Sequence, residues 1–344
     1  MNLYDLSPAE LEHRLEDLVT PSYRIRQVEE WMHVRGAASF EEMTSLPLSM
    51  REELAARDSL AAPAVREITP PAPDGSEKFL FTLEDGGLIE AVYMPMGDRT
   101  TLCLSSQAGC AVGCTFCVTG FFGPGRNLTP SEMVGQVNVI RRAKKIDPER
   151  LNLVFMGMGE PLLNLENVRK AMEIFSRTIS HRRITLSTAG IVPGIEDLAR
   201  LEKRPNLAIS INAPDDARRA EIMPITTKYP LAGLIRALEA FPLERGREIT
   251  IEYVLLAGYN DSDRDAASLA RLIRGLRAKV NAIPFNPDPH LPDWMKRPDE
   301  TAIDRFAGSL VRHGARVTVR RSKGLDIAAA CGQLRGKTER RRRS

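Results

Sequence analysis

Short apolar segments alternate with helical segments over more than half of the chain, from residue 101 to residue 322. The segments with the length and composition of buried strands are Thr101–Ser106, Leu151–Met156, Arg183–Ser187, Asn206–Ile211, Glu248–Leu255, Val280–Phe285 and Arg316–Arg321. Strands separated by helices pair in parallel, because a helical crossover returns the chain to the same end of the sheet. The pattern therefore predicts an α/β fold with a parallel sheet covered by helices, either doubly wound or a barrel.

Glycine placement distinguishes these two arrangements. A doubly wound sheet that binds a dinucleotide carries three spaced glycines in the turn after its first strand. No predicted strand is followed by that motif, and Gly157-Met158-Gly159 lacks its third glycine. The sequence therefore favours a TIM-like barrel, or part of one.

Residue types suited to chemistry gather at the carboxyl ends of the predicted strands. They are Cys110, Cys114 and Cys117 after the first strand, Gly159 and Glu160 after the second, Ser187 in the third, Ser210 and Asn212 at the fourth, and Asn286 after the sixth. Each of them alone could belong to a turn or a cap. In parallel barrels, however, the carboxyl ends of the strands form the active site, so their shared position predicts one.

The cysteine spacing is the most specific chemical signal. Cys110, Cys114 and Cys117 lie within the uncharged stretch Thr100–Gly125. A structural zinc ion needs four ligands, and no fourth ligand with zinc-site spacing is nearby. Three thiolates instead suit a [4Fe–4S] cluster with one open iron. The alternative is a buried cysteine trio with loose zinc affinity.

Residues 1–70 are predicted to form a separate helical accessory domain. Ser7-Pro8-Ala9-Glu10 has the pattern of a capping box with proline at the first helical position. Further helices are predicted around residues 23–34 and 49–57. The surface of this domain is charged, and the sequence does not indicate its role.

Residues 71–100 are predicted to form a hairpin and linker with a turn at Asp85-Gly86. In the strand after this turn, Glu90 shares a face with Leu88 and Val92. A carboxyl group among apolar neighbours is expected to have a raised pKa, which suits a general base near neutral pH. The alternative is an edge-strand residue that reaches solvent.

The charge of the chain is concentrated at its C-terminus. The chain contains 48 basic and 45 acidic residues, for a net charge of +3. Residues 335–344 hold six of the basic residues and one of the acidic residues, so this tail carries +5 and the remainder carries −2. The barrel and its C-terminal segment, residues 101–334, therefore precede a basic tail.

The sequence argues against a membrane protein. The stretch Thr100–Gly125 is long enough to span a bilayer, but its glycines, cysteines and polar side chains would be costly there. Residues 1–19 contain acidic residues and lack the apolar core of a signal peptide. We therefore expect a cytoplasmic protein, in which five cysteines favour metal or redox chemistry over structural disulfides.

Several longer motifs carry a resemblance to a known family. They are Cys103-Leu-Ser-Ser-Gln-Ala-Gly-Cys110, Arg126-Asn127-Leu128, Gly157-Met158-Gly159-Glu160-Pro161, Met223-Pro224 with Lys228-Tyr229-Pro230, Asn260-Asp261-Ser262, and Ala330-Cys331-Gly332-Gln333-Leu334. With the three-cysteine motif, they resemble the RlmN/Cfr class of RNA adenosine methyltransferases in the radical SAM superfamily. The resemblance spans Glu90 to Leu334 and implies a partial TIM-like barrel with an N-terminal helical domain.

The resemblance implies two cofactors. Cys110, Cys114 and Cys117 match the ligands of the [4Fe–4S] cluster, and two molecules of S-adenosyl-L-methionine are used per turnover. Family residues that hold S-adenosyl-L-methionine match Gly159, Glu160, Ser187, Ser210, Ile211, Asn212 and Asn286. The family methylates an amidine carbon of adenosine, whose C–H bond is not usefully acidic, so a radical route supplied by the cofactors is needed.

The resemblance also implies roles for three residues outside this set. Cys331 matches a cysteine that first accepts a methyl group and then joins the RNA covalently to the protein. Cys103 matches the thiol that releases the RNA by forming a disulfide with Cys331, and Glu90 matches the base. Without the resemblance, each of these two cysteines would be interpreted as a buried core residue. The chain departs from the family at Asn212, where many members have histidine; asparagine forms hydrogen bonds but cannot titrate.

The implied substrate is C2 of adenosine in 23S rRNA at the peptidyl-transferase centre. A tRNA adenosine 3′ of the anticodon is a second expected substrate, and a flavodoxin system is the expected electron donor. The alternatives are C8 methylation, as in the Cfr branch, and a non-enzymatic zinc-binding RNA module. Basic pairs such as Arg141-Arg142 and Arg218-Arg219 indicate RNA only weakly, because such pairs are usually solvated.

Overall fold

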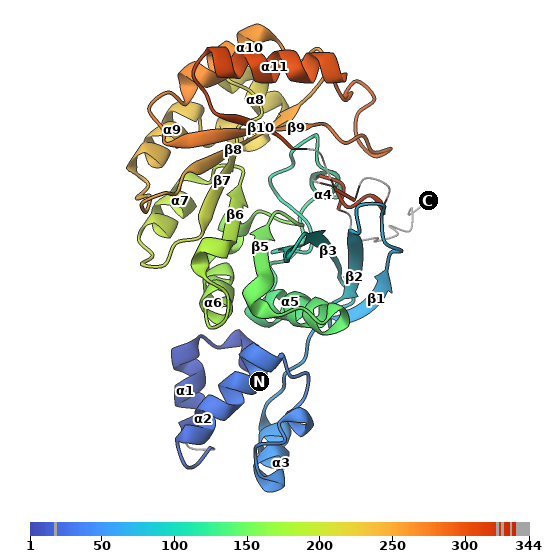
Figure 1. Cartoon of the computed structure of the whole chain (residues 1–344), viewed down its shortest axis with the longest axis vertical. Helices are drawn as coiled ribbons and strands as arrows, with labels where there is room; N and C mark the ends of the chain where they lie inside the picture. The colour runs from blue at the N-terminus through green and yellow to red at the C-terminus, as the bar shows by residue number, and fades with distance from the viewer. Residues whose placement is uncertain (17–18, 321–322, 325–326, 331, 335–344) are drawn as a thin grey trace.

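A single sheet of ten strands forms the centre of the molecule (Figure 1). The computed structural model describes the chain except residues 17–18, 321–322, 325–326, 331 and 335–344. The strands are β1 (Ala64–Ile68), β2 (Glu77–Thr82), β3 (Leu88–Met96), β4 (Arg99–Cys103), β5 (Leu151–Phe155), β6 (Ile184–Thr188), β7 (Asn206–Ser210), β8 (Ile249–Leu255), β9 (Ala278–Pro284) and β10 (Val317–Val319). Each strand pairs with its neighbours in sequence. Among the described residues β1 and β10 do not pair, so the sheet is an open part-barrel.

The pairing direction changes at β4. Strands β1 to β4 are antiparallel, and β4 to β10 are parallel. The reason is the kind of connection: short loops without helices join the first four strands, whereas helices join the later ones. The helices are α4 (Val118–Phe121), α5 (Pro130–Lys144), α6 (Leu165–Phe175), α7 (Val192–Ala199), α8 (Asp216–Ile222), α9 (Leu231–Ala240), α10 (Asp263–Leu272) and α11 (Glu300–Arg312).

The two faces of the parallel sheet differ in burial. In β5, Leu151 and Leu153 are fully buried in the main core, whereas Asn152 and Val154 are half-buried. Because side chains alternate along a strand, one face packs under the helices and the other faces the inside of the curved sheet. The inward face is therefore free to line a site.

The N-terminal helices dock on the outside of the barrel. They are α1 (Pro8–Glu16), α2 (Tyr23–Glu29) and α3 (Leu48–Arg57), and a π-helical segment, Glu30–Arg35, follows α2. Short 3₁₀ helices occur at Leu3–Asp5, Phe40–Glu42, Pro148–Arg150, Pro161–Asn164, His181–Arg183 and Pro224–Thr227. Arg141 of α5 donates hydrogen bonds to the carbonyls of His33 and Val34, and Arg142 donates to Gly36 and pairs with Glu42. The two arginines thus hold the N-terminal module to α5.

The expected fold class is confirmed, with one addition. All seven predicted strands are present, and the sheet continues into three antiparallel strands ahead of the parallel run. The predicted capping box at Ser7–Glu10 forms, and a second capping box at Thr129–Glu132 begins α5. In the pair Arg141-Arg142, Arg141 is buried and Arg142 is exposed, and the guanidinium groups of both bind the N-terminal module. Within the described part of the chain, none of the helices combines the length and apolar character needed to span a lipid bilayer.

Candidate active site

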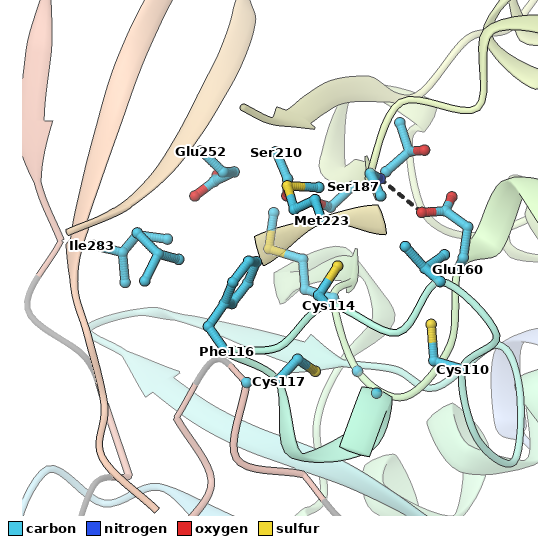
Figure 2. A pocket seen from close by; sticks show the side chains of 18 of the residues that line it. Cys110, Cys114, Phe116, Cys117, Glu160, Ser187, Ser210, Met223, Glu252 and Ile283 are labelled. Atoms are coloured by element: carbon cyan, nitrogen blue, oxygen red, sulfur yellow. Dashed lines mark hydrogen bonds between the residues drawn. The ribbon is translucent and has the colours of Figure 1, made fainter. Parts of the chain in front are cut away.

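A pocket opens at the carboxyl ends of the parallel strands (Figure 2). It brings together most of the residues that the sequence singled out: Cys110, Cys114, Cys117, Gly159, Glu160, Ser187, Ser210 and Asn286. These residues come from the loops or ends of five different strands, β4, β5, β6, β7 and β9. The sheet therefore gathers them at one point, as expected for a barrel active site.

The loop that carries the three cysteines is shaped by close backbone contacts. Cys110 donates its amide hydrogen to the carbonyl of Gly123, and Cys117 donates to that of Cys114, at 2.9 and 3.1 Å. A Cβ atom on Gly120 would lie 2.9 Å from the Cys114 carbonyl oxygen, so this position requires glycine. The three sulfur-bearing side chains lie around one side of the pocket (Figure 2).

The chemistry of these thiols fits a cluster better than a single ion. Burial raises the pKa of Cys110 to about 12 and that of Cys114 well above its usual value, and the neighbouring thiols act in the same direction. A bound cation is therefore needed to hold them as thiolates. Three soft ligands spread around a pocket suit the larger [4Fe–4S] cluster.

Glu160 is a buried carboxylate in the same pocket, near Cys110 (Figure 2). Its oxygens accept hydrogen bonds from the amides of Ala189 at 2.7 Å and Leu162 at 3.0 Å. Burial raises the pKa of Glu160 to about 7, and these hydrogen bonds, with one from Thr188, oppose the shift. The preceding residue, Gly159, has φ of +100°, and a Cβ there would lie 2.5 Å from the Cβ of Gln107. The glycine thus lets the loop place Glu160 in the pocket.

Many of the residues that line the pocket lie outside the sequence-based set of site residues, and three of them have side chains that bear on its chemistry or shape. Phe116, Met223 and Glu252 line the pocket (Figure 2). Glu252 is paired in register with Ser210, its carboxylate accepts a hydrogen bond from Asn281 at 2.9 Å, and burial raises its pKa. A glutamate in the apolar strand β8 is the signal that could have identified it.

Arg219 does not line the pocket, but it holds two residues that do. It is fully buried, and its guanidinium donates to the carbonyls of Ala189 at 2.7 Å and Ser210 at 3.0 Å, where β6 and β7 end. It also donates to Thr226 and Ile211. Burial lowers its pKa to about 10, so the side chain stays charged at neutral pH. The Arg218-Arg219 pair therefore does not lie on a solvated helix face.

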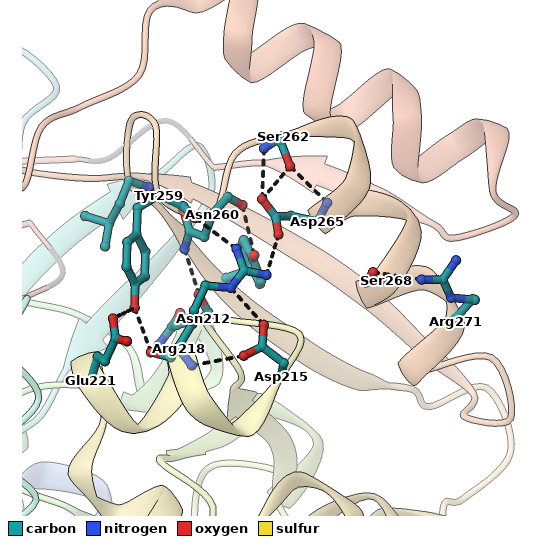
Figure 3. A network of polar contacts seen from close by, with 12 residues as sticks. Asn212, Asp215, Arg218, Glu221, Tyr259, Asn260, Ser262, Asp265, Ser268 and Arg271 are labelled. Atoms are coloured by element: carbon teal, nitrogen blue, oxygen red, sulfur yellow. Dashed lines mark hydrogen bonds and ion pairs between the residues drawn. The ribbon is translucent and has the colours of Figure 1, made fainter.

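Ile211 and Asn212 are not among the residues that line the pocket. Asn212 has φ of +59°, a left-handed conformation that asparagine tolerates better than most residues. Its side chain is buried and accepts a hydrogen bond from the amide of Val254 at 2.8 Å. Asn212 thus belongs to the network of polar contacts that Figure 3 shows. The predicted cofactor contacts of the two residues stay a prediction.

Glu90 and Cys103 are buried on neighbouring strands, β3 and β4. Cys103 pairs with Val92, and Glu90 lies two residues from Val92, so both side chains are on one face of the sheet. Cys103 is also level with Val154, which places this face on the inside of the curved sheet. The Glu90 carboxylate lies 3.2 Å from Lys78 Nζ, so its charge has a buried partner. Neither Glu90 nor Cys103 lines the pocket directly.

Cys331 lies outside the described residues, but the residues around it are described. Gly332 lines the pocket, and its carbonyl accepts a hydrogen bond from the amide of Val118 at 2.7 Å. Thr119 donates to the carbonyl of Leu334, and Gln333 donates to that of Pro287. The C-terminal segment therefore contacts both α4 and the loop after β9.

Comparisons with known proteins agree with this architecture. Residues 104–270 match the model of the radical SAM superfamily, and residues 1–59 match the ribosomal RNA large subunit methyltransferase N-terminal domain. The crystal structure of a radical SAM methyltransferase from Sphaerobacter thermophilus is similar with a TM-score of 0.92 and 45% identity, covering 98% of this chain and 100% of that chain.

Two curated relatives carry the name dual-specificity RNA methyltransferase RlmN. The protein from Geobacter sulfurreducens is 47% identical over 98% of this chain and 93% of its own length. That from Anaeromyxobacter dehalogenans is 46% identical over 97% and 91%.

The part-barrel, the cysteine loop and the superfamily match define a radical SAM enzyme, a class that uses a [4Fe–4S] cluster and S-adenosyl-L-methionine. Such an enzyme is not the zinc-binding module that the sequence left open. Within this class, the chain belongs to the RlmN family of radical SAM RNA methyltransferases.

Proposed function

We propose that the protein methylates C2 of adenosine in 23S rRNA at the peptidyl-transferase centre, and of the tRNA adenosine 3′ of the anticodon. The observation that carries the proposal is the meeting of the three cysteines, Glu160 and Gly332 in one pocket. Gly332 directly follows Cys331, the proposed methyl carrier. The dual-specificity RNA methyltransferases among the relatives support two RNA substrates.

The residues present fit both cofactors. Three thiols face a pocket whose other walls offer a carboxylate, hydroxyls and an amide, the groups that suit an amino acid and a nucleoside. The cluster would be held by Cys110, Cys114 and Cys117, and S-adenosyl-L-methionine by Gly159, Glu160, Ser187, Ser210, Ile211, Asn212 and Asn286. When bound, the two cofactors supply the radical chemistry that an unreactive ring carbon requires.

The proposed reaction assigns three roles to the chain itself. Cys331 carries the incoming methyl group on its sulfur, and this carbon becomes the bridge between protein and RNA. Glu90 takes the proton from the ring carbon. The Cys103 thiolate then attacks the Cys331 sulfur: a disulfide forms, the sulfur–carbon bond breaks, and the released carbon takes up a proton to become the methyl group. The shared inward face of Glu90 and Cys103 supports these roles.

We also propose a division of the chain into domains with different roles. Residues 1–70 form the accessory domain, residues 71–100 supply Glu90, residues 101–334 form the barrel and its catalytic segment, and residues 335–344 are a basic tail. The match of residues 1–59 to an N-terminal domain model supports the first division. The cytoplasm, where rRNA and tRNA occur, is the proposed location, with a flavodoxin system as the electron donor.

Nucleoside analysis tests this proposal. The protein is reconstituted anaerobically with iron and sulfide and then incubated with S-adenosyl-L-methionine, a reductant and unmodified 23S rRNA or tRNA. Digestion and mass spectrometry should yield 2-methyladenosine from both RNAs. The Cys110→Ala variant, which lacks one cluster ligand, should yield none.

Other products would refute specific parts of the proposal. Formation of 8-methyladenosine without 2-methyladenosine would assign the enzyme to the C8 reaction. Methylation of rRNA alone would remove tRNA as a substrate. Absence of any methylated adenosine, with cluster content intact, would refute both reactions.

A further inference from the structure

Phenylalanine is distributed unevenly in this molecule. Eight of its 11 phenylalanines are buried, and the other three are Phe116, Phe121 and Phe122. All three follow Cys114 within a few residues, in the cysteine loop and at the end of α4. Phe116 lines the pocket, but Phe121 is 60% exposed. Because burial of a large apolar side chain stabilises a fold, the exposure of Phe121 has no explanation in core packing.

The exposed ring of Phe121 and the half-buried ring of Phe122 contact a third ring from another loop. The centroid of His290 lies 5.9 Å from that of Phe121 and 5.3 Å from that of Phe122. The two phenylalanine rings are 5.5 Å apart and nearly perpendicular. These spacings and angles are those of interacting aromatic pairs. We call Phe121, Phe122 and His290 the ring cluster.

The three residues of the ring cluster do not line the pocket, but each belongs to a segment that does. On one side, Gly120 lines the pocket and Phe121 follows it directly at the end of α4. On the other side, Asn286 lines the pocket, and His290 follows four residues later in the loop after β9. A group bound against Phe121 therefore contacts a residue adjacent in sequence to the pocket lining.

The imidazole is held in place by a buried acid. His290 Nδ1 lies 2.7 Å from Asp288 Oδ1, and the His290 amide donates to the same oxygen at 3.0 Å. The Asp288 side chain is only 4% exposed. The ring cluster is thus oriented in advance, so binding does not have to order the imidazole.

We propose that the ring cluster is a stacking site for the unpaired nucleobase next to the target adenosine. The inference rests on the proposed function, since it requires an RNA substrate. A base that undergoes chemistry in a pocket must leave its stack, and its neighbour then loses a stacking partner. Proteins bind such unpaired bases by stacking them on Phe, Tyr, Trp or His side chains. Phe121 offers such a surface next to Gly120, which lines the pocket.

A fluorescent RNA tests the stacking site directly. The probe is an RNA hairpin with the target adenosine in its loop and 2-aminopurine placed immediately 5′ or 3′ of it. With the anaerobically reconstituted full-length protein, stacking should quench 2-aminopurine in one of the two positions. Phe121→Ala should lose this quenching and weaken RNA binding about tenfold, the effect expected for one stacked base. Phe121→Trp should retain both.

The matched control is Val311→Ala. Val311 is also 60% exposed, but it lies on α11, outside the pocket. This variant should bind and quench the probe like the unsubstituted protein. Iron content and cluster absorbance of each variant confirm that the site is intact.

Three results would overturn the inference or its basis. If Phe121→Ala binds and quenches the probe normally, no base stacks on Phe121. If it does so but is reduced more slowly by a flavodoxin, the exposed ring belongs to an electron-donor surface instead. If the unsubstituted protein neither binds nor methylates the RNA, the proposed function is wrong. That result differs from failure of the stacking site alone, in which the unsubstituted protein still methylates the RNA.

Discussion

The side-chain amide of Asn260 donates a hydrogen bond to the main-chain carbonyl of Asn212 at 2.6 Å (Figure 3). The same amide donates to the carbonyl of Val254 at 2.7 Å, and the Asn212 side chain accepts from the Val254 amide. These contacts join β7 and β8 beyond their last register pair, Ser210 and Glu252. Because both members of that pair line the pocket, the two asparagines fix the position of one pocket wall.

Asn260→Ala should therefore weaken cofactor binding as well as stability. The substitution leaves two buried carbonyls without their donor, which costs about 1–3 kcal/mol of unfolding free energy. The affinity for S-adenosyl-L-methionine should also fall, because Ser210 is no longer held in place. Urea unfolding and equilibrium dialysis with the reconstituted protein measure the two effects.

Asn206→Ala is the control for this prediction. Asn206 donates to the carbonyl of Arg182 at 2.8 Å at the amino end of β7, away from the pocket. Loss of this hydrogen bond should lower the unfolding free energy without changing the affinity for S-adenosyl-L-methionine. Equal losses of affinity in both variants would contradict the positioning role of Asn260.

A second prediction concerns the buried ion pair of Lys78 and Glu90. Lys78 Nζ lies 3.2 Å from the Glu90 carboxylate and donates to the carbonyl of Ala328 at 3.2 Å; the two charged side chains are 11% and 4% exposed. Lys78→Met removes the cation beside a buried carboxylate, so unfolding free energy should fall by about 3–5 kcal/mol. Adding Glu90→Gln should restore much of the loss. Urea unfolding of the two single variants and the double variant measures the coupling.

An exposed pair provides the comparison. Arg35 and Glu30 are 2.8 Å apart, but their side chains are 52% and 51% exposed. Glu30→Gln should cost no more than about 1 kcal/mol, because solvent screens the pair. The burial argument is wrong if the two single variants, Lys78→Met and Glu30→Gln, lose similar stability.

The sequence predicts the sheet and most of the pocket because these depend on local patterns. Apolar segments of strand length recur between helical segments, and the chain order of the strands is also their order in the sheet. Parallel pairing then brings the strand ends together, so Glu160 and Ser187 meet the cysteines without any further information.

Long-range partners could not be predicted in this way. Arg219 is part of an ordinary basic pair in the sequence, yet it is fully buried on carbonyls at the ends of β6 and β7. Lys78 has no local feature that indicates a partner in β3 or in the segment before Cys331. Asn212 has φ of +59°, and its side chain contacts Val254 and Met223 instead of lining the pocket itself, which residue type alone does not reveal. Such contacts depend on tertiary geometry.

A third prediction separates the roles of the two redox cysteines. Cys331→Ala should carry no methyl group and form no adduct with RNA. Cys103→Ala should still accept the methyl group and attack RNA but fail to release it, because no thiol remains to cleave the bond at the Cys331 sulfur. Denaturing gel electrophoresis with labelled RNA should show a covalent protein–RNA species in the second variant alone. Normal turnover by Cys103→Ala, without an adduct, would show that another group performs the release.

The last prediction uses a buried histidine in the N-terminal module. Burial lowers the pKa of His33 to about 4, from about 6.5 in an unfolded chain, and the charge of Arg177 acts in the same direction. Its Nε2 has no hydrogen-bond partner in the described part of the chain, and its ring contacts Tyr4 edge-on. Between these two pKa values the unfolded state binds the proton that the folded state excludes.

The stabilising contribution of neutral His33 is therefore complete above about pH 6.5 and decreases as the pH falls toward 4. The loss over this window should reach about 3 kcal/mol, from 1.36 kcal/mol per pKa unit. His33→Phe keeps the ring contact with Tyr4 and removes the titration, so its unfolding free energy should fall less steeply between pH 7 and pH 4.5. Urea unfolding across this range measures the two slopes. Parallel slopes would mean that His33 is protonated without cost in the folded protein, and that its burial does not govern the acid sensitivity of the module.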